Sequence, residues 1–141
     1  MGLDASLVGR SYPASAAYEV GREEVRRFAS AVRTGDGGEP VAAPPTYPFV
    51  VAWRALQPLL EDPGLGIALE RVVHGEQRFA LTRALVPGDR VSGTATVESV
   101  RVLGPAALVA VRVDLTAAEG PLGSAWSTLV ISSAASGEAS A

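Results

Sequence analysis

Few side chains in this sequence can transfer a proton near neutral pH. His74 is the only histidine, and all 12 cationic residues are arginines, because the chain has no lysine. Cysteine is also absent. These absences exclude a Schiff-base lysine, a P-loop lysine, a thiol nucleophile, a disulfide framework and a cysteine-ligated metal centre. One histidine cannot form a multi-histidine metal site, so we expect neither a metal nor another cofactor.

A first helix is expected to follow Gly21. Apolar residues recur there at the spacing of one helical face, at Val25, Phe28, Ala29 and Val32. The helix should end near Thr34, because glycines and prolines are frequent in residues 35–45 and predict a loop. Asp36 lies in this loop, where aspartate is favoured for turn geometry alone.

A second helix is expected over residues 46–60, which are apolar on almost every side. Such a helix belongs in the centre of a fold rather than on its surface. Thr46 could cap its N-terminus, and Pro48 suits the first turn. We expect Pro58 to kink or restart the helix.

From Ala68 onward the hydrophobic period changes to two, which is typical of half-buried antiparallel strands. Turns rich in glycine and proline separate four expected strands, at residues 68–83, 90–103, 107–118 and 122–132. A shorter strand is expected at residues 18–20. In the strand at 68–83, alternation predicts one face with Leu69, Val73, Phe79 and Leu81 and an opposite face with Glu70, His74, Glu76 and Arg78. We expect Trp53 and Trp126 in the core.

This order of elements predicts an α+β hot-dog fold, in which an antiparallel sheet wraps around one central apolar helix. We expect a single domain over residues 1–133 and a disordered tail over 134–141. The long strand at 68–83 would leave an uncovered sheet edge, so we expect it to pair with a second subunit in a dimer.

Bulk properties narrow the range of partners. The formal net charge is −3 and the sequence pI about 5.1, which gives no support for nucleic-acid binding. No segment is long and apolar enough for a membrane span, and no signal peptide is visible, so we expect a cytoplasmic location and no membrane partner.

Several short motifs resemble one family. They are residues 7–12 (LVGRSY), 18–23 (YEVGRE), 43–48 (APPTYP), 74–79 (HGEQRF) and 87–89 (PGD). In this order and spacing they resemble the MaoC-like dehydratases, and more specifically the FAS1-like dehydratase hot-dog domains and related hydroxyacyl-ACP dehydratase subunits. The resemblance implies a (3R)-hydroxyacyl-thioester dehydratase or enoyl-thioester hydratase, a hydro-lyase that acts on acyl-CoA or acyl-carrier-protein thioesters in fatty acid or polyketide metabolism.

One departure from the family pattern is important. Active members carry an aspartate and a histidine between the first helix and the central one, whereas this chain has Asp36 but no histidine after it in that loop. The leading hypothesis is therefore a subunit of a homodimer or, with a second hot-dog chain that supplies the catalytic pair, of a heterodimer. Two alternatives stay open: a stand-alone variant dehydratase or cyclase that uses His74 or Asp36, and a non-enzymatic acyl-binding or scaffold protein.

The candidate site residues follow from this resemblance. His74 and Asp36 are the candidate catalytic residues, although His74 could instead be an interface histidine bonded to a backbone carbonyl. Candidate substrate-binding residues are Thr46, Tyr47, Glu76, Gln77 and Arg78. Backbone N–H groups near Thr46 and Tyr47 could form an oxyanion hole for the thioester. Arg78, Arg83 and Arg90 could meet a phosphate of the carrier, or could simply be surface arginines.

Overall fold

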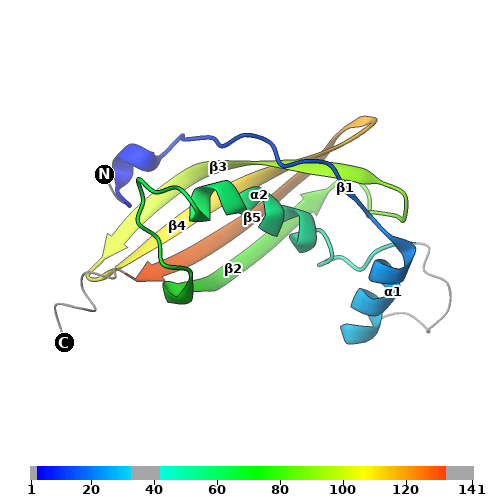
Figure 1. Ribbon diagram of the computed structural model, residues 1–141, viewed down its shortest axis with the longest axis horizontal. Helices are drawn as coiled ribbons and strands as arrows, with labels where there is room; N and C mark the ends of the chain where they lie inside the picture. Colours follow the sequence, from blue (N-terminus) through cyan, green and yellow to red (C-terminus); the bar gives the residue numbers. More distant parts are fainter. Residues whose placement is uncertain (1–2, 33–41, 133–141) are drawn as a thin grey trace.

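The computed structural model describes residues 3–32 and 42–132 of the chain, and Figure 1 shows their arrangement. A short 3-10 helix, Ala5–Leu7, precedes strand β1 (Tyr18–Glu19) and helix α1 (Arg22–Ala31). Helix α2 (Phe49–Leu60) and a second 3-10 helix, Leu69–Arg71, come next. The remaining strands are β2 (Val72–Leu81), β3 (Arg90–Leu103), β4 (Ala106–Ala117) and β5 (Gly120–Ser132). The expected tail at 134–141 and most of the expected loop after α1 lie outside the described residues.

The strands form one antiparallel sheet in the order β1-β3-β4-β5-β2. The sheet curls around α2, which lies across its inner face, while α1 lies to one side (Figure 1). The expected hot-dog arrangement of a sheet around a central helix is thus confirmed. Buried residues of α2 such as Val51, Leu56 and Leu59 pack with the inward-facing residues of β3, β4 and β5 in one core.

A close contact between helix and sheet occurs at Gly93 in β3. A Cβ atom at this position would lie 2.8 Å from Cγ1 of Val113 and 3.0 Å from Cβ of Ala55. Ala55 is fully buried in α2. The pair of small residues therefore lets the helix approach the sheet backbone closely.

The two edges of the sheet differ in the described chain. The N-terminal segment covers the free edge of β3 through backbone bonds, among them Tyr12 N to Ala95 O at 2.9 Å and Ser15 N to Gly93 O at 2.9 Å. Strand β2 forms the opposite edge and pairs with β5 alone. Its outer edge is not covered by any described strand.

Several local predictions need correction. Leu69–Arg71 forms a 3-10 helix, so the strand begins at Val72 rather than near Ala68. Helix α2 continues through Pro58 to Leu60 without a restart. Trp126 lies half-buried on the outer face of β5, where the Arg78 guanidinium stacks 4.6 Å from its ring centre. Trp53 is also only half-buried, although it packs against the core.

Candidate functional site

A β-bulge in β2 decides which side chains face the central helix. The register of β2 against β5 shifts between His74 and Glu76, so Gly75 is the extra residue. Before the bulge His74 is opposite Leu129, and after it Gln77 is opposite Ser127. Leu129 and Ser127 are both buried on the inner face of β5. Paired residues share a face, so His74 and Gln77 both point to the inner side.

The prediction that His74 shares the outer face with Glu76 and Arg78 is therefore wrong. In a regular strand, strict alternation assigns each residue to one face of the sheet. One inserted residue reverses that assignment for the residues on one side of the bulge. The His74 ring lies 5.0 Å from the ring of Phe49, at an interplanar angle of 33°. Glu76 is opposite Thr128 and lies on the outer face, away from His74.

A cavity of about 470 Å³ lies between the start of α2 and strand β2. Its lining residues come from α1, the turn before α2, α2 itself and β2, and they are Phe28, Pro45, Thr46, Phe49, His74, Gln77, Arg78 and Phe79. The structure thus brings three predicted site residues together here: Thr46, His74 and Gln77. Arg78 also reaches the lining, but its guanidinium stacks on Trp126 on the outer face of the sheet. Most of the other lining side chains are apolar, which suits a site for an acyl chain.

The polar groups of the cavity have few partners among the described residues. No described residue hydrogen-bonds to the His74 imidazole. The side-chain oxygen of Gln77 accepts a hydrogen bond of 2.5 Å from the buried Ser127 hydroxyl. The described lining contains no carboxylate. His74 is therefore the one side chain in that lining of a type that enzymes use for general acid–base catalysis.

The start of α2 differs from the expected cap. The N-cap residue is Pro48, and no side chain caps the helix. A turn precedes it, in which the N–H groups of Tyr47, Phe49 and Val50 donate to the carbonyls of Pro44, Thr46 and Tyr47. The Tyr47 N–H is therefore already used, whereas no backbone acceptor among the described residues takes the Thr46 N–H, so an oxyanion hole at Thr46 stays a prediction. Thr46 does not cap the helix, and its side chain lines the cavity instead.

Tyr47 lies beneath the cavity wall rather than on it. Its ring packs edge-on against Phe28 at 5.2 Å. The Tyr47 hydroxyl is buried and has no hydrogen bond of good geometry in the described chain, although the Tyr18 hydroxyl is near enough to influence it. Burial first, and then Tyr18, raise the pKa of the Tyr47 hydroxyl above its ordinary value. Tyr47 therefore stays protonated and supports Phe28.

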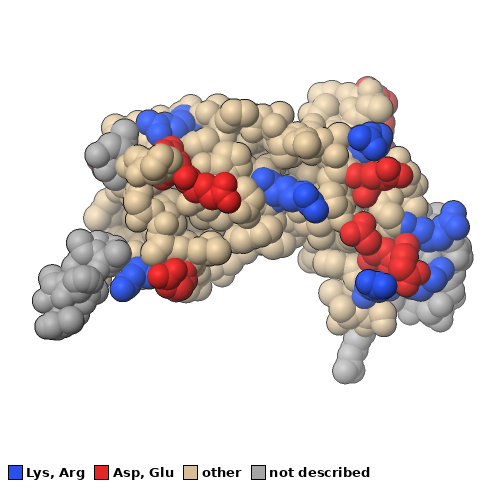
Figure 2. Space-filling view, in the orientation of Figure 1, with Lys and Arg blue, Asp and Glu red and all other residues tan. Residues whose placement is uncertain are grey.

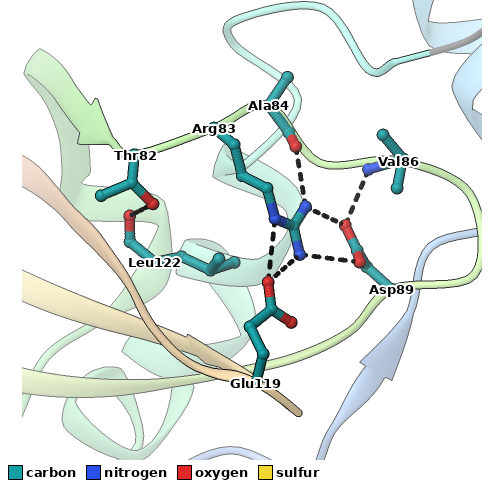
Figure 3. Close-up of polar contacts among 7 residues, drawn as sticks. All are labelled: Thr82, Arg83, Ala84, Val86, Asp89, Glu119 and Leu122. Carbon is teal, nitrogen blue, oxygen red and sulfur yellow. Dashed lines mark hydrogen bonds and ion pairs between the residues drawn. The ribbon is translucent and has the colours of Figure 1, made fainter.

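The three arginines considered as phosphate ligands are in different situations. Arg83 is paired with Asp89 and Glu119 (Figure 3), and Arg90 lies 3.4 Å from a carboxylate oxygen of Glu19. Arg78 stacks on Trp126. In the view of Figure 2, acidic and basic side chains are intermixed around α1, and the described residues form no broad basic patch on the face drawn. These observations favour ordinary surface pairing for Arg83 and Arg90.

Asp36, the other candidate catalytic residue, lies outside the described residues. The described ranges hold no group of three or more histidine, cysteine, aspartate or glutamate side chains placed to bind a metal ion. Within the same ranges, no helix has the length and hydropathy needed to cross a membrane.

Sequence reasoning misses two residues of the site. The sequence pattern places Phe49 in the buried helix, yet its ring lies on the cavity wall against His74. Ser127 does not stand out among the motifs, although a signal exists: it occupies an inward position between Ala125 and Leu129, where an apolar residue is expected.

The curled sheet around one helix, with a cavity between them, defines this protein as a hot-dog-fold protein. A model of the FAS1-like dehydratase domain region matches residues 6–122. The UPF0336 protein SCO4636 of Streptomyces coelicolor is 39% identical over 143 residues, which cover 92% of this chain and 95% of the relative. The UPF0336 protein Lxx02810 of Leifsonia xyli is 42% identical, again over 92% of this chain and 95% of the relative. The chain belongs to the FAS1-like dehydratase family, which is a family of dehydratases and hydratases.

Solved structures agree with this assignment. The HadBC (3R-hydroxyacyl-ACP dehydratase) complex of Mycobacterium tuberculosis matches with a TM-score of 0.73 and 25% identity, over 88% of this chain and 96% of that chain. The (R)-hydratase of A. caviae shares the fold, with a TM-score of 0.56 and 15% identity over 87% and 94% of the two chains. The resemblance to MaoC-like and FAS1-like dehydratases expected from the sequence motifs is confirmed.

Proposed function

We propose that this chain is a subunit of a (3R)-hydroxyacyl-thioester dehydratase or enoyl-thioester hydratase, and that a second hot-dog chain supplies the catalytic aspartate and histidine. One observation carries the proposal: the cavity is mostly apolar and, in its described lining, offers His74 but no carboxylate. The described lining is suited to hold an acyl chain and contributes one acid–base side chain to the reaction.

The chemistry favours two acid–base groups, because the reaction has two proton transfers. Dehydration removes a proton from Cα and the hydroxyl from Cβ as water, so a C–H and a C–O bond break while a C=C bond forms. A base must accept the Cα proton and an acid must protonate the departing hydroxyl. Hydration reverses both transfers. A partner chain with an aspartate and a histidine would provide these groups.

The edge of β2 that no described strand covers supports a two-chain arrangement. A strand edge presents unpaired N–H and C=O groups and is usually covered in soluble proteins. Val73 in β2 is 62% exposed, and Leu69, just before it, is 58% exposed. A second hot-dog chain at this edge would cover the apolar side chains and bring its own residues to the cavity. The comparison with HadBC, itself a complex, agrees with this arrangement.

A reconstitution assay tests the proposal. The isolated chain, a MaoC-like chain from the same genome with an intact aspartate–histidine pair, and their mixture would each be assayed for hydration of crotonyl-CoA and of the crotonyl carrier-protein thioester. We expect each chain alone to be at least about 100-fold less active than the mixture, since losing a general acid or base costs about 10²–10⁴-fold. Full activity of the isolated chain would contradict the two-chain version.

A second candidate, a stand-alone dehydratase or cyclase, has one observation in its favour. The His74 imidazole lies on the cavity wall and has no hydrogen-bond partner among the described residues. It is thus placed to exchange a proton with a bound substrate, with Asp36 as the second group. This candidate predicts that His74→Ala and Asp36→Ala each abolish turnover by the isolated chain. If the isolated chain has no turnover to lose, and the mixture tolerates His74→Ala, the stand-alone candidate fails.

A further inference from the structure

Ser127 is the single buried polar residue of the described chain, at 1% exposure. It lies on the inner face of β5, directly opposite Gln77 in β2. A buried hydroxyl gains by donating its proton, because an unpaired buried donor costs about 1–3 kcal/mol. Its acceptor here is the Gln77 Oε1 atom, at 2.5 Å.

This bond fixes the orientation of the Gln77 amide. Oε1 can accept from Ser127 only if the NH₂ group is on the opposite side of the amide group. The one contact of Nε2 within the described chain is the carbonyl oxygen of the neighbouring Arg78, at 3.4 Å, which is a long hydrogen bond. Nε2 is therefore the donor that Gln77 offers to the cavity it lines.

Gln77 is half-buried, and its surroundings strengthen this donor once a bound acyl group excludes water from the cavity. Phe49 and Phe79 line the same cavity as Gln77, and a hydrogen bond in an apolar environment is stronger than one in water. The N–H groups of Tyr47, Phe49 and Val50 at the start of α2 are already used by its preceding turn. The Gln77 amide is thus better placed than those N–H groups to bind a carbonyl oxygen.

We propose that Gln77 Nε2 donates a hydrogen bond to the carbonyl oxygen of the bound thioester, and that Ser127 is the positioning residue that holds the amide in this orientation. The inference rests on the proposed function. Removal of the Cα proton moves negative charge onto the thioester oxygen, and the Gln77 donor stabilises that charge. Because the charge develops in the transition state, the bond contributes to kcat more than to KM.

A double-mutant cycle in the reconstituted enzyme tests this assignment. Gln77→Met keeps the side-chain length without the donor and should lower kcat by about 10²-fold, the lower end of the effect of losing an oxyanion donor. Ser127→Ala frees the amide to rotate and should lower kcat by about tenfold. When combined with Gln77→Met, Ser127→Ala should have no further effect, because Ser127 acts through Gln77.

Two controls separate positioning from folding. Ser127→Thr retains a hydroxyl at the same position and should restore most of the activity lost in Ser127→Ala. Ser124→Ala removes a hydroxyl from the same strand, where it bonds to Asp114 Oδ1 at 2.7 Å, and should leave kcat unchanged. Urea unfolding of each variant verifies that the fold is retained.

The outcomes distinguish this inference from the proposed function. If the wild-type pair hydrates crotonyl thioesters but Ser127→Ala lowers kcat as much in the Gln77→Met variant as in the wild type, positioning through Gln77 is overturned. A rise in KM with unchanged kcat in Gln77→Met overturns the carbonyl assignment. If the wild-type pair has no turnover, the proposed function fails. In that case, NMR of the Gln77 side-chain amide with crotonyl-pantetheine tests the inference separately. Absence of a chemical-shift change in this amide would overturn the inference.

Discussion

Two polar regions of this protein differ in how completely their polar groups are hydrogen-bonded. The Arg83 cluster, defined as Arg83, Asp89 and Glu119, pairs all three of its charged groups (Figure 3). In the cavity, by contrast, His74 has an aromatic ring rather than a described hydrogen-bond partner beside it. Among the described residues, Gln77 has a good hydrogen-bond partner only for its side-chain oxygen.

The Arg83 cluster joins separate parts of the chain. The Arg83 guanidinium bonds both carboxylate oxygens of Asp89, at 2.8 and 3.0 Å, and Glu119 Oε2 at 2.7 and 3.0 Å. Asp89 also accepts from the Val86 N–H at 2.8 Å. These bonds fasten the β2–β3 connection to the β4–β5 turn. Polar groups that are fully paired serve structure, whereas unpaired ones on an apolar wall are available for a ligand.

The largest stability effect is expected from breaking the Arg83 cluster at Asp89. Asp89→Ala removes the acceptor of Arg83 and of the Val86 N–H, and hydrogen bonds to charged groups contribute about 1.5–3 kcal/mol. The Asp89 side chain is only 13% exposed, so we expect a loss of about 2 kcal/mol in the free energy of unfolding, measured by urea denaturation. Asp89→Asn keeps an acceptor and should lose less. An Asp89→Ala loss within experimental error would show that the cluster is not structural.

Acid should break the same cluster. Hydrogen bonding from Arg83 holds the pKa of Asp89 below its ordinary value of 3.8, despite the opposing effect of burial. A carboxyl group whose pKa is lower in the folded than in the unfolded state stabilises the fold at pH values above its ordinary pKa. This stabilisation is lost as the pH falls through the lower pKa of the folded state. Urea denaturation at a series of pH values should show this loss below pH 3.8. Asp89→Asn should flatten that part of the profile, and an unchanged profile would contradict the assignment.

Glu119, the exposed member of the cluster, should contribute little. Its side chain is 58% exposed, and exposed ion pairs contribute about 0.2–1 kcal/mol because water and salt screen them. Glu119→Gln should therefore destabilise the fold by much less than Asp89→Ala in the same urea titration. A loss equal to that of Asp89→Ala would mean that the cluster acts as one unit.

The smallest stability effect is expected in the cavity. His74→Phe exchanges one ring for another beside Phe49 and removes no hydrogen bond to a described residue. We expect the free energy of unfolding to change by less than about 0.5 kcal/mol, while any proton transfer at this position is lost. A loss above about 1 kcal/mol would favour the other interpretation of His74, a structural histidine with a hydrogen-bonded partner.

Much of the fold could be predicted from residue patterns. The apolar residues of 46–60 predict the central helix, and the alternation of residues 90–103 predicts β3 with its observed bounds, Arg90–Leu103. Both predictions rest on hydrophobic periodicity, which depends only on residues that are close together in the sequence. The sheet around the helix follows, because the sheet has one apolar face to bury and the helix is apolar on almost every side.

The site was less predictable because it depends on contacts between distant residues. Alternation alone puts His74 on the wrong face of its strand, since the Gly75 bulge appears only when β2 is aligned with β5. Gln77 and Ser127 are 50 positions apart, so neither local sequence indicates that they share a hydrogen bond. The sequence by itself determined the elements and the scarcity of acid–base groups. The tertiary structure decided which of the remaining polar groups face the cavity, because strand register and packing, rather than composition, set that choice.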